Sequence, residues 1–269
     1  MSFSTSKTNY RNQVLLVLAV IAILVFPNAL AVEQIPITRS YTMDNVIFDG
    51  KWSFFEEWKK SSLYTLSYND GTTIQLRLAH QGDFIYAFVD ETSKTQFTKG
   101  SDRAIICMDG NNDKNITPDS DDYCFVLSLG QNNPFVLKGG SALGATDHFN
   151  KIENVTITGV AAISDKNDHY TPTPHPGYEF KIPINLFGRS DVYGFYLGVY
   201  DAISHKTYSF PEDLSSNSNS IPSPSKWGEI ISPDKSIPEF PWPVLALSVS
   251  ITALILLRKS ILFSQYKKQ

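Results

Sequence analysis

Cysteine, methionine and histidine are scarce in this sequence, whose 269 residues contain two, three and five of them. Motifs of common catalytic classes are also absent: no G-x-S-x-G, no H-E-x-x-H and no glycine-rich phosphate loop is present. The sequence shows neither an internal repeat nor the pattern of a long amphipathic helix. These absences argue against a hydrolase with a standard motif and against a helical or repeat protein.

The first 31 residues have the layout of a secretory signal peptide. Lys7 and Arg11 precede an uncharged apolar run over 14–26, and Ala29 and Ala31 occupy the two positions that a signal peptidase reads. The run is short for a membrane span. We predict cleavage near Ala31, with an uncleaved anchor as the alternative.

A second apolar segment lies near the end of the chain. Residues 242–257 carry no charge and are followed by Arg258 and Lys259. About sixteen residues at 1.5 Å rise reach roughly 24 Å, which is short for the hydrocarbon core but workable with snorkelling lysines and local thinning. The basic cluster keeps the tail inside. We predict a stalk over 232–241, a transmembrane anchor over 242–259 and a cytoplasmic tail over 260–269.

The residues before the anchor also form a short motif. Pro238, Glu239 and Phe240, followed by an apolar segment and a basic stop, resemble the PEF-type sorting signal of exported archaeal surface proteins. In that family a membrane transpeptidase, an archaeosortase, cuts near the motif and replaces the helix with a lipid. An ordinary single-span anchor remains the alternative.

Between the ends lies one domain, residues 32–231, which both end signals place outside the cell at the cell membrane. Residues 32–236 carry 17 Lys and Arg against 26 Asp and Glu, a net charge of −9. This acidity argues against nucleic acid or an anionic membrane surface as the partner. About 200 residues suffice for one β-rich domain with its own core.

Alternating apolar residues predict short strands throughout this domain. In 83–90 three aromatic residues alternate with Ile85, Ala87 and Val89, so both faces are apolar and the strand is expected at the centre of a sheet. Further strands are predicted over 63–68, 72–80, 103–109, 123–129, 155–163, 178–184, 192–201 and 227–230, with one or two helical turns over 53–60. This pattern predicts an all-β fold, an antiparallel β-sandwich with jelly-roll or immunoglobulin-like layers.

The order of the segments carries a resemblance. The relevant stretches are FDGKWSFFEEW (48–58), DGTTIQLRLAHQGDFIYAFVDET (70–92), RAIICMDGNNDK (103–114), DDYCFVL (121–127), GYEFKIPINLFGRSDVYGFYLGVYDA (177–202) and WGEI (227–230). Together they resemble the DOMON-like sandwiches and, among these, the family 9 carbohydrate-binding modules. The resemblance implies the sandwich fold. It does not imply one function, because relatives of this fold bind sugars, bind haem or are purely structural.

The two cysteines flank one loop. Cys107 lies in the strand before the loop and Cys124 in the strand after it. In an oxidising exterior we predict that they form a disulfide across an antiparallel pair. Closing a loop of this size stabilises the fold by about 3 kcal/mol in the chain-entropy model.

The loop between the cysteines is rich in acidic residues. It contains the D-x-N-x-D run of Asp109, Asn111 and Asp113, and then Asp119, Asp121 and Asp122. These six residues are candidate ligands of a structural calcium ion. The helix-loop-helix calcium pattern is not met, because Lys114 and Ser120 replace its glycine and glutamate. A solvated turn is the alternative.

Aromatic residues are the candidate sugar contacts. We predict that Trp52 and Tyr170 bind ligand, with Trp52 exposed, and that Trp58 and Trp227 pack in the core. His169 and His175 flank a proline-rich loop and are expected to face solvent. Other polar features are weaker: Glu56 and Glu57 are adjacent and make a poor glycosidase pair, and Asn115 and Asn154 begin N-x-T glycosylation sequons.

The sequence therefore favours an exported, membrane-anchored and non-catalytic surface module that binds carbohydrate or another component of the cell envelope. A haem-binding electron-transfer domain of the same fold is one alternative. Haem is not expected, because the methionines after the signal peptide are Met43 and Met108, and Met108 adjoins a bridged cysteine. An accessory domain of glycan processing is the other alternative, although no acid/base pair is evident.

Overall fold

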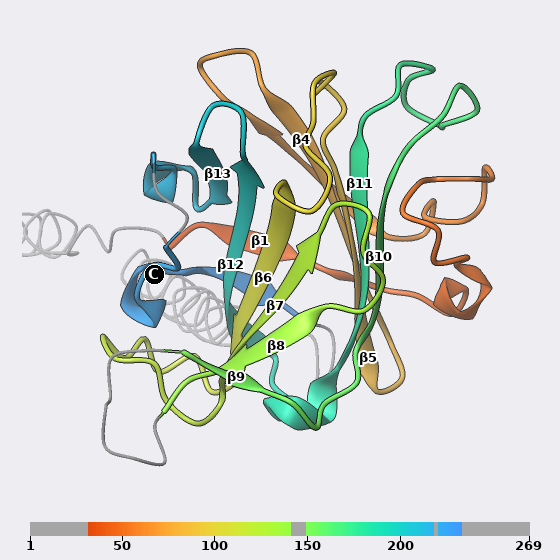
Figure 1. The fold of residues 1–269 in the computed structure, drawn as a ribbon. Helices are drawn as coiled ribbons and strands as arrows, with labels where there is room; N and C mark the ends of the chain where they lie inside the picture. The colour runs from red at the N-terminus through yellow and green to blue at the C-terminus, as the bar shows by residue number, and fades with distance from the viewer. Residues whose placement is uncertain (1–31, 141–148, 218–219, 233–269) are drawn as a thin grey trace, which may run out of the picture. The chain divides into compact units, whose positions relative to one another are not determined.

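The computed structural model describes residues 32–140, 149–217 and 220–232, and in these ranges the chain is all-β. Two β-sheets pack face to face, as the strand pattern predicts (Figure 1). No helix in the described ranges is long and apolar enough to cross a membrane. The predicted signal peptide, the anchor, the cytoplasmic tail and nearly all of the stalk lie outside the described residues.

The larger sheet has the strand order β1-β14-β12-β6-β7-β8-β9, with β13 also paired to β12. One side of β12 pairs with β6, while the other side pairs first with β14 and then with β13. The strands are β1 (Gln34–Pro36), β6 (Arg103–Asp109), β7 (Asp122–Ser128), β8 (Phe135–Lys138), β9 (Asn150–Ile152), β12 (Val192–Asp201), β13 (Lys206–Phe210) and β14 (Gly228–Ile231).

The smaller sheet has the order β10-β11-β5-β4-β2, with β3 also paired to β4. Its strands are β2 (Thr38–Arg39), β3 (Ser62–Ser67), β4 (Thr73–Gln81), β5 (Phe84–Asp90), β10 (Thr158–Ile163) and β11 (Pro176–Pro183). Four short 3-10 helices complete the described elements: η1 (Met43–Asn45), η2 (Ile184–Leu186), η3 (Glu212–Leu214) and η4 (Pro224–Lys226).

Some details differ from the sequence prediction. The sheets are not wholly antiparallel, because β1 runs parallel to β14 and β2 parallel to β4. These two short strands lie close together in the sequence, so the chain crosses from one sheet to the other near Ile37. Residues 55–60 form hydrogen-bonded turns, in keeping with the one or two turns expected over 53–60. Strands β8, β9 and β13 have patterns too short or too polar to be predicted.

Strand β5 is central in the smaller sheet, as predicted, and lies between β11 and β4. Its Ile85, Ala87 and Val89 point into the core between the sheets, while Tyr86 and Phe88 lie on the outer face. A strand alternates its side chains between two faces. The outer face of this sheet must therefore also be covered.

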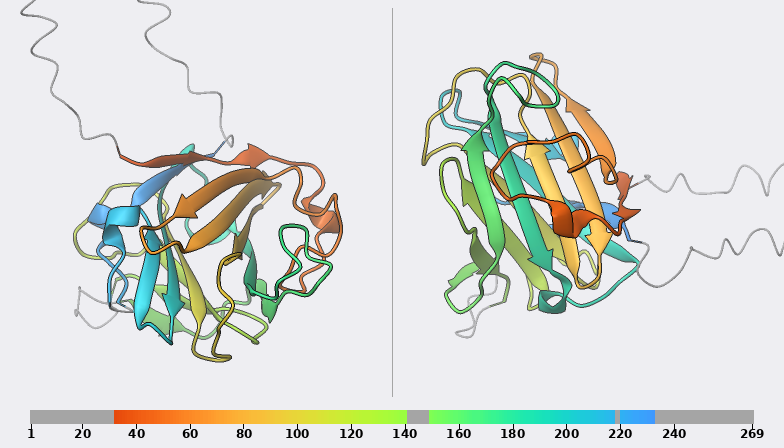
Figure 2. Two further views of the ribbon diagram at one scale, coloured as in Figure 1. Left: turned by 90° about the horizontal axis from the view of Figure 1, so that it is seen from above. Right: turned by 90° about the vertical axis from the view of Figure 1, so that its right-hand side faces the viewer.

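Residues 40–61, called the covering segment below, provide that cover. Figure 2 shows this segment across the outer face of the smaller sheet in its right-hand view. Its Trp52 and Trp58 pack with Tyr86 and Phe88 in a second apolar cluster. Trp58 stacks on Phe88 with ring centroids 5.4 Å apart.

A buried carboxyl group on β11 attaches the covering segment to the sheet. Glu179 accepts hydrogen bonds from the backbone N–H groups of Asp49 at 2.8 Å and Gly50 at 2.6 Å, and from Trp58 Nε1 at 3.0 Å. Gly50 has a positive φ of 80°, and a Cβ there would lie 2.4 Å from the backbone nitrogen of Ala162. Glycine is thus required at this close approach.

The outer face of the larger sheet carries the disulfide. Cys107 and Cys124 are directly opposite each other in β6 and β7 and are bonded, which confirms the predicted pairing. Both are fully buried in a third cluster with Tyr196 and Trp227. The prediction that Trp58 and Trp227 pack in apolar clusters is confirmed as well, although both lie on outer faces and not between the sheets.

Candidate functional site

A small polar pocket lies at the end of the sandwich where β5 and β12 finish, at the upper end in Figure 1. Its volume is about 260 Å³. The chain regions that form it are the turn before β4, the segment after β5, the β12–β13 turn and β13 itself. The residues are Thr72, Glu91, Ser93, Lys94, Thr95, Gln96, Asp201, Ile203 and Tyr208. Both sheets therefore contribute to one pocket.

Ionic groups hold the floor of this pocket in place. Lys94 Nζ lies 2.9 Å from Asp201 Oδ1 and 3.1 Å from Asp102 Oδ2. Asp102 in turn accepts hydrogen bonds from the backbone N–H groups of Thr98 and Ala202, each at 2.8 Å. One lysine thus ties the segment after β5 to the β12–β13 turn, and the pocket is preorganised by charge.

Glu91 is the least satisfied member of this group. Its Oε2 accepts a long hydrogen bond of 3.4 Å from the Tyr178 hydroxyl, and its Oε1 is buried with no hydrogen-bond partner among the described residues. Burial raises the pKa of Glu91 to about 8, although the Lys94 ammonium opposes that rise. A carboxyl group with a spare buried oxygen can bind a donor such as a ligand hydroxyl.

The pocket also has an apolar side. Ile203 is half exposed, and the Tyr208 ring packs against Tyr68 with centroids 4.9 Å apart. The Tyr208 hydroxyl donates to Asp70 Oδ2 at 2.9 Å, and Lys206 Nζ lies 2.7 Å from the same oxygen. The result is a mixture of charged, hydroxyl, amide and apolar groups, which suits a small ligand with both hydroxyls and C–H faces.

The predicted ligand residues Trp52 and Tyr170 lie elsewhere, and the prediction that Trp52 is exposed is wrong. Trp52 is 2% exposed, because the covering segment folds back onto the sheet. The Arg77 guanidinium lies 4.5 Å above its ring and donates from Nε to the Tyr170 hydroxyl at 2.8 Å. Trp52 and Tyr170 thus do come together, at 5.4 Å between centroids, but as packing for the covering segment.

Aromatic groups nearby are more accessible. Phe55 is 59% exposed, and its ring centroid lies 5.7 Å from that of His169, which is exposed as predicted. His169 packs on Trp52 at 4.0 Å between ring centroids. This patch is the part of the predicted aromatic site that solvent can reach.

The acidic loop is held by its own hydrogen bonds. Asp109 accepts from the backbone N–H groups of Asn112 at 2.6 Å and Lys114 at 3.2 Å. Asp113 accepts from Asn111 Nδ2 at 3.2 Å and from Asn115 N at 3.0 Å and Nδ2 at 2.7 Å. Calcium would have to replace these donors, so its binding at this loop stays a prediction.

The remaining acids of the loop are close enough to influence one another. Asp109, the last residue of β6, and Asp122, the first residue of β7, are opposite each other, and both are buried. Burial raises the pKa of Asp122 to about 8 and that of Asp121 to about 6. The neighbouring Asp121 holds the pKa of Asp119 below its usual value. Clustered carboxyl groups retain protons in this way when no cation compensates them.

Both sequon asparagines, Asn115 and Asn154, are exposed, so neither position hinders the predicted glycosylation. At Asn115 the side-chain amide also donates to Asp119 Oδ2 at 3.0 Å. A glycan on this nitrogen would replace one of the hydrogens that the loop uses.

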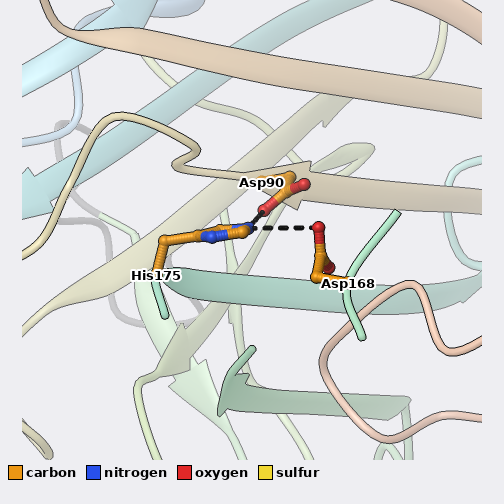
Figure 3. A group of neighbouring side chains, drawn as sticks. All are labelled: Asp90, Asp168 and His175. Atoms are coloured by element: carbon orange, nitrogen blue, oxygen red, sulfur yellow. Dashed lines mark ion pairs between the residues drawn. The ribbon is translucent and has the colours of Figure 1, made fainter. Parts of the chain in front are cut away.

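His175 differs most from its prediction. It is fully buried, not facing solvent, and its Nε2 lies 2.6 Å from Asp90 Oδ1 and 3.8 Å from Asp168 Oδ1 (Figure 3). In the described part of the chain this trio forms the one group of three or more His, Cys, Asp or Glu side chains close enough to hold a metal ion. The acidic loop does not form such a group.

Sequence reasoning missed the pocket and the buried trio, and a weak signal existed for both. Asp90 and Glu91 are two adjacent acids at the end of a strongly apolar strand. Acids at that position have to be paired or to serve a site, because an isolated buried charge is costly. Asp168 and His175, which meet Asp90, come from a loop far away in the sequence, and Asp201, which lines the pocket with Glu91, is the last residue of β12.

Comparisons with known proteins found a similarity among solved structures alone. No protein-family model matches the sequence, and no curated protein matches it. Among solved structures, the chain is similar to a family 9 carbohydrate-binding module from Caldicellulosiruptor kristjanssonii in complex with cellotriose. The identity is 14%, the match covers 78% of this chain and 100% of that chain, and the TM-score is 0.47.

Proposed function

We propose that this protein is a non-catalytic binding module whose end pocket takes one small, hydroxyl-rich unit, a sugar residue of a carbohydrate or of another envelope component. The observation that carries the proposal is the pocket itself, where the buried Glu91 Oε1 lacks a partner among the described residues. At about 260 Å³ it is slightly smaller than the roughly 300–1,000 Å³ of drug-sized sites. It therefore suits a single unit.

The chemistry of the walls supports a neutral polyol over a charged ligand. Lys94 is already neutralised by Asp102 and Asp201, so it offers no free charge for an anion. Ser93, Thr95 and Gln96 are exposed on the rim and can both donate and accept hydrogen bonds. The resemblance of the sequence segments to family 9 modules favours the same class of ligand.

A direct test is a glycan array probed with the full-length chain in detergent, followed by titration of the glycans that bind. Changing Gln96 and Ile203 together to Ala removes rim contacts without touching the ionic floor. We expect this double variant to weaken binding about tenfold, equivalent to about 1.4 kcal/mol. Ile116→Ala, which is 79% exposed in the acidic loop at the other end, should bind as wild type.

A second variant locates the binding site. If Phe55→Ala abolishes glycan binding and the rim variant does not, sugar binds the aromatic patch on the covering segment and the pocket proposal is wrong. If no glycan binds at all, the ligand class is wrong.

We also propose where the domain lies in the cell. Residues 32–231 are exported and held at the cell membrane by the segment after them, with the signal peptide removed near Ala31. A chain that ends before Ile237 should appear in the culture medium, where immunoblotting detects it. Recovery of this shortened chain with the membranes would contradict the anchor.

A further inference from the structure

Three side chains that can bind a metal ion, Asp90, Asp168 and His175, lie together in a buried position at the 164–175 loop. His175 and Asp168 come from this loop, and Asp90 is the last residue of β5 (Figure 3). Their side chains are 0–1% exposed, so water cannot separate the charges. Asp90 and the pocket residue Glu91 point to opposite faces of the sheet, so this position is distinct from the sugar pocket.

The tautomer of His175 follows from its other ring nitrogen. Nδ1 lies 2.7 Å from the carbonyl oxygen of Thr173, and a carbonyl can only accept, so Nδ1 carries a proton. In a neutral ring the lone pair is then on Nε2, which faces the two carboxylates. Fixing Nδ1–H on a backbone carbonyl is how metal-binding histidines are oriented in proteins.

Two carboxylate oxygens of the group lack a partner. Asp90 Oδ1 lies 2.6 Å from His175 Nε2, and a metal ion would replace the proton between them. Within the described ranges, Asp90 Oδ2 and Asp168 Oδ2 are buried without a hydrogen-bond partner. Asp168 Oδ1 is fixed by the backbone N–H of Tyr170 at 2.9 Å, which orients this carboxylate toward the group. Buried polar atoms are rarely left unpaired, so two free carboxylate oxygens beside one histidine favour a bound cation.

We propose that Asp90, Asp168 and His175 bind a divalent transition-metal ion, Zn²⁺ in the first instance, which ties the 164–175 loop to strand β5. Ligands about 2.0–2.2 Å from zinc lie roughly 3.4 Å apart in a tetrahedron. The observed 2.6 and 3.8 Å bracket that separation. Imidazole favours zinc and its neighbours over calcium, which prefers all-oxygen sites.

The ion would have a structural consequence beyond its ligands. His169 and Tyr170, on the same loop, pack on Trp52 of the covering segment. Arg77 is a nearby cation, and it donates to the Tyr170 hydroxyl and the Trp58 carbonyl. The metal therefore holds the loop that clamps the covering segment onto the sheet.

The test uses the full-length chain in detergent, treated with chelator, desalted and then supplied with Zn²⁺ alone. We expect one zinc ion per chain in elemental analysis, a higher melting temperature with zinc, and visible d–d absorption when Co²⁺ replaces it. Asp168→Asn keeps the shape of the loop and should weaken zinc binding about tenfold or more. His175→Gln should remove it.

Control variants of other acidic residues test whether zinc binds at Asp90, Asp168 and His175 and not elsewhere in the chain. Asp165→Asn, in the same loop but 45% exposed at its side chain and paired with Lys51, should bind zinc as wild type. The double variant Asp109→Asn, Asp113→Asn should also bind it. Zinc retained in full by Asp168→Asn, or no Co²⁺ absorption in the wild type, would overturn the proposal and leave a protonated His175 as the positive group.

Discussion

Single buried acids organise much of this domain. Glu179 joins the covering segment to β11 through three donors, and Glu57 accepts from the backbone N–H groups of Ile47 and Ser53, both at 2.8 Å. Burial raises the pKa of Glu179, while the Gly50 and Trp58 donors oppose that rise. Buried acids of this kind are often candidates for catalysis. Here Glu57 and Glu179 instead accept hydrogen bonds from backbone N–H groups of the covering segment, which has little regular structure of its own.

The first prediction concerns Glu179. Its replacement by Ala leaves three donors, two of them buried, without an acceptor, so the free energy of unfolding should fall by about 3 kcal/mol. For a domain of this size that corresponds to roughly 6–12 °C in melting temperature. Thermal unfolding followed by circular dichroism measures the change.

A conservative variant and a control variant test whether the lost acceptor causes this change in stability. Glu179→Gln keeps one acceptor oxygen and should lose less stability than Glu179→Ala. Glu56 lies in the covering segment and is exposed, so Glu56→Ala should change the melting temperature little. Equal melting temperatures for Glu179→Ala and Glu56→Ala would show that Glu179 does not anchor the covering segment.

In the hairpin of β6 and β7, a buried disulfide lies next to a loop of clustered carboxyl groups. The disulfide joins the two strands in the apolar third cluster, and two residues further along each strand Asp109 and Asp122 face each other. The loop beyond them is ordered by backbone N–H groups that donate to carboxylates, in the manner of Asx turns. The disulfide therefore joins the two strands two residues before the acidic loop begins.

The second prediction concerns calcium at this loop. If calcium binds the folded chain alone, a hundredfold excess over Kd adds about 2.7 kcal/mol to the free energy of unfolding. The full-length chain should then melt several degrees higher in millimolar calcium than in chelator, and magnesium should help less. The double variant Asp109→Asn, Asp113→Asn should lose most of the difference. Identical melting in calcium and chelator would identify the loop as a hydrogen-bonded turn.

At the scale of the whole molecule, charge and burial make the stability depend on pH. Glu91 and Asp122 each have a pKa of about 8 in the folded chain because they are buried, well above the ordinary 4.5 and 3.8. The folded chain thus binds protons that the unfolded chain has released between about pH 4 and pH 8. Folding stability therefore falls as pH rises through this window.

The third prediction is that the melting temperature in chelator falls by several degrees from pH 5.5 to pH 8.5. Asp122→Asn should flatten this dependence, because an amide at that position does not titrate. A profile that rises toward pH 8.5, or that is unchanged in Asp122→Asn, would contradict the assignment. Chelator is included so that no metal ion competes with protons.

Local patterns determined much of this fold from the sequence alone. The apolar patterns of β4, β5 and β12 gave the positions of these strands, and the two apolar faces of β5 gave its central place in the sheet. The pairing of Cys107 with Cys124 also followed, since two cysteines in adjoining strands allow one partner each. The all-β class and the two sheets needed nothing beyond these neighbours in sequence.

The tertiary structure decided the candidate sites. Trp52 is buried because the covering segment returns to a sheet whose outer face is apolar, and His175 because its loop folds over Asp90. The end pocket joins Glu91 and Lys94 to Asp201, more than a hundred residues away. No local sequence pattern specifies these contacts between distant residues. Which side chains are buried or paired depends on which distant segments cover a strand once both sheets have packed.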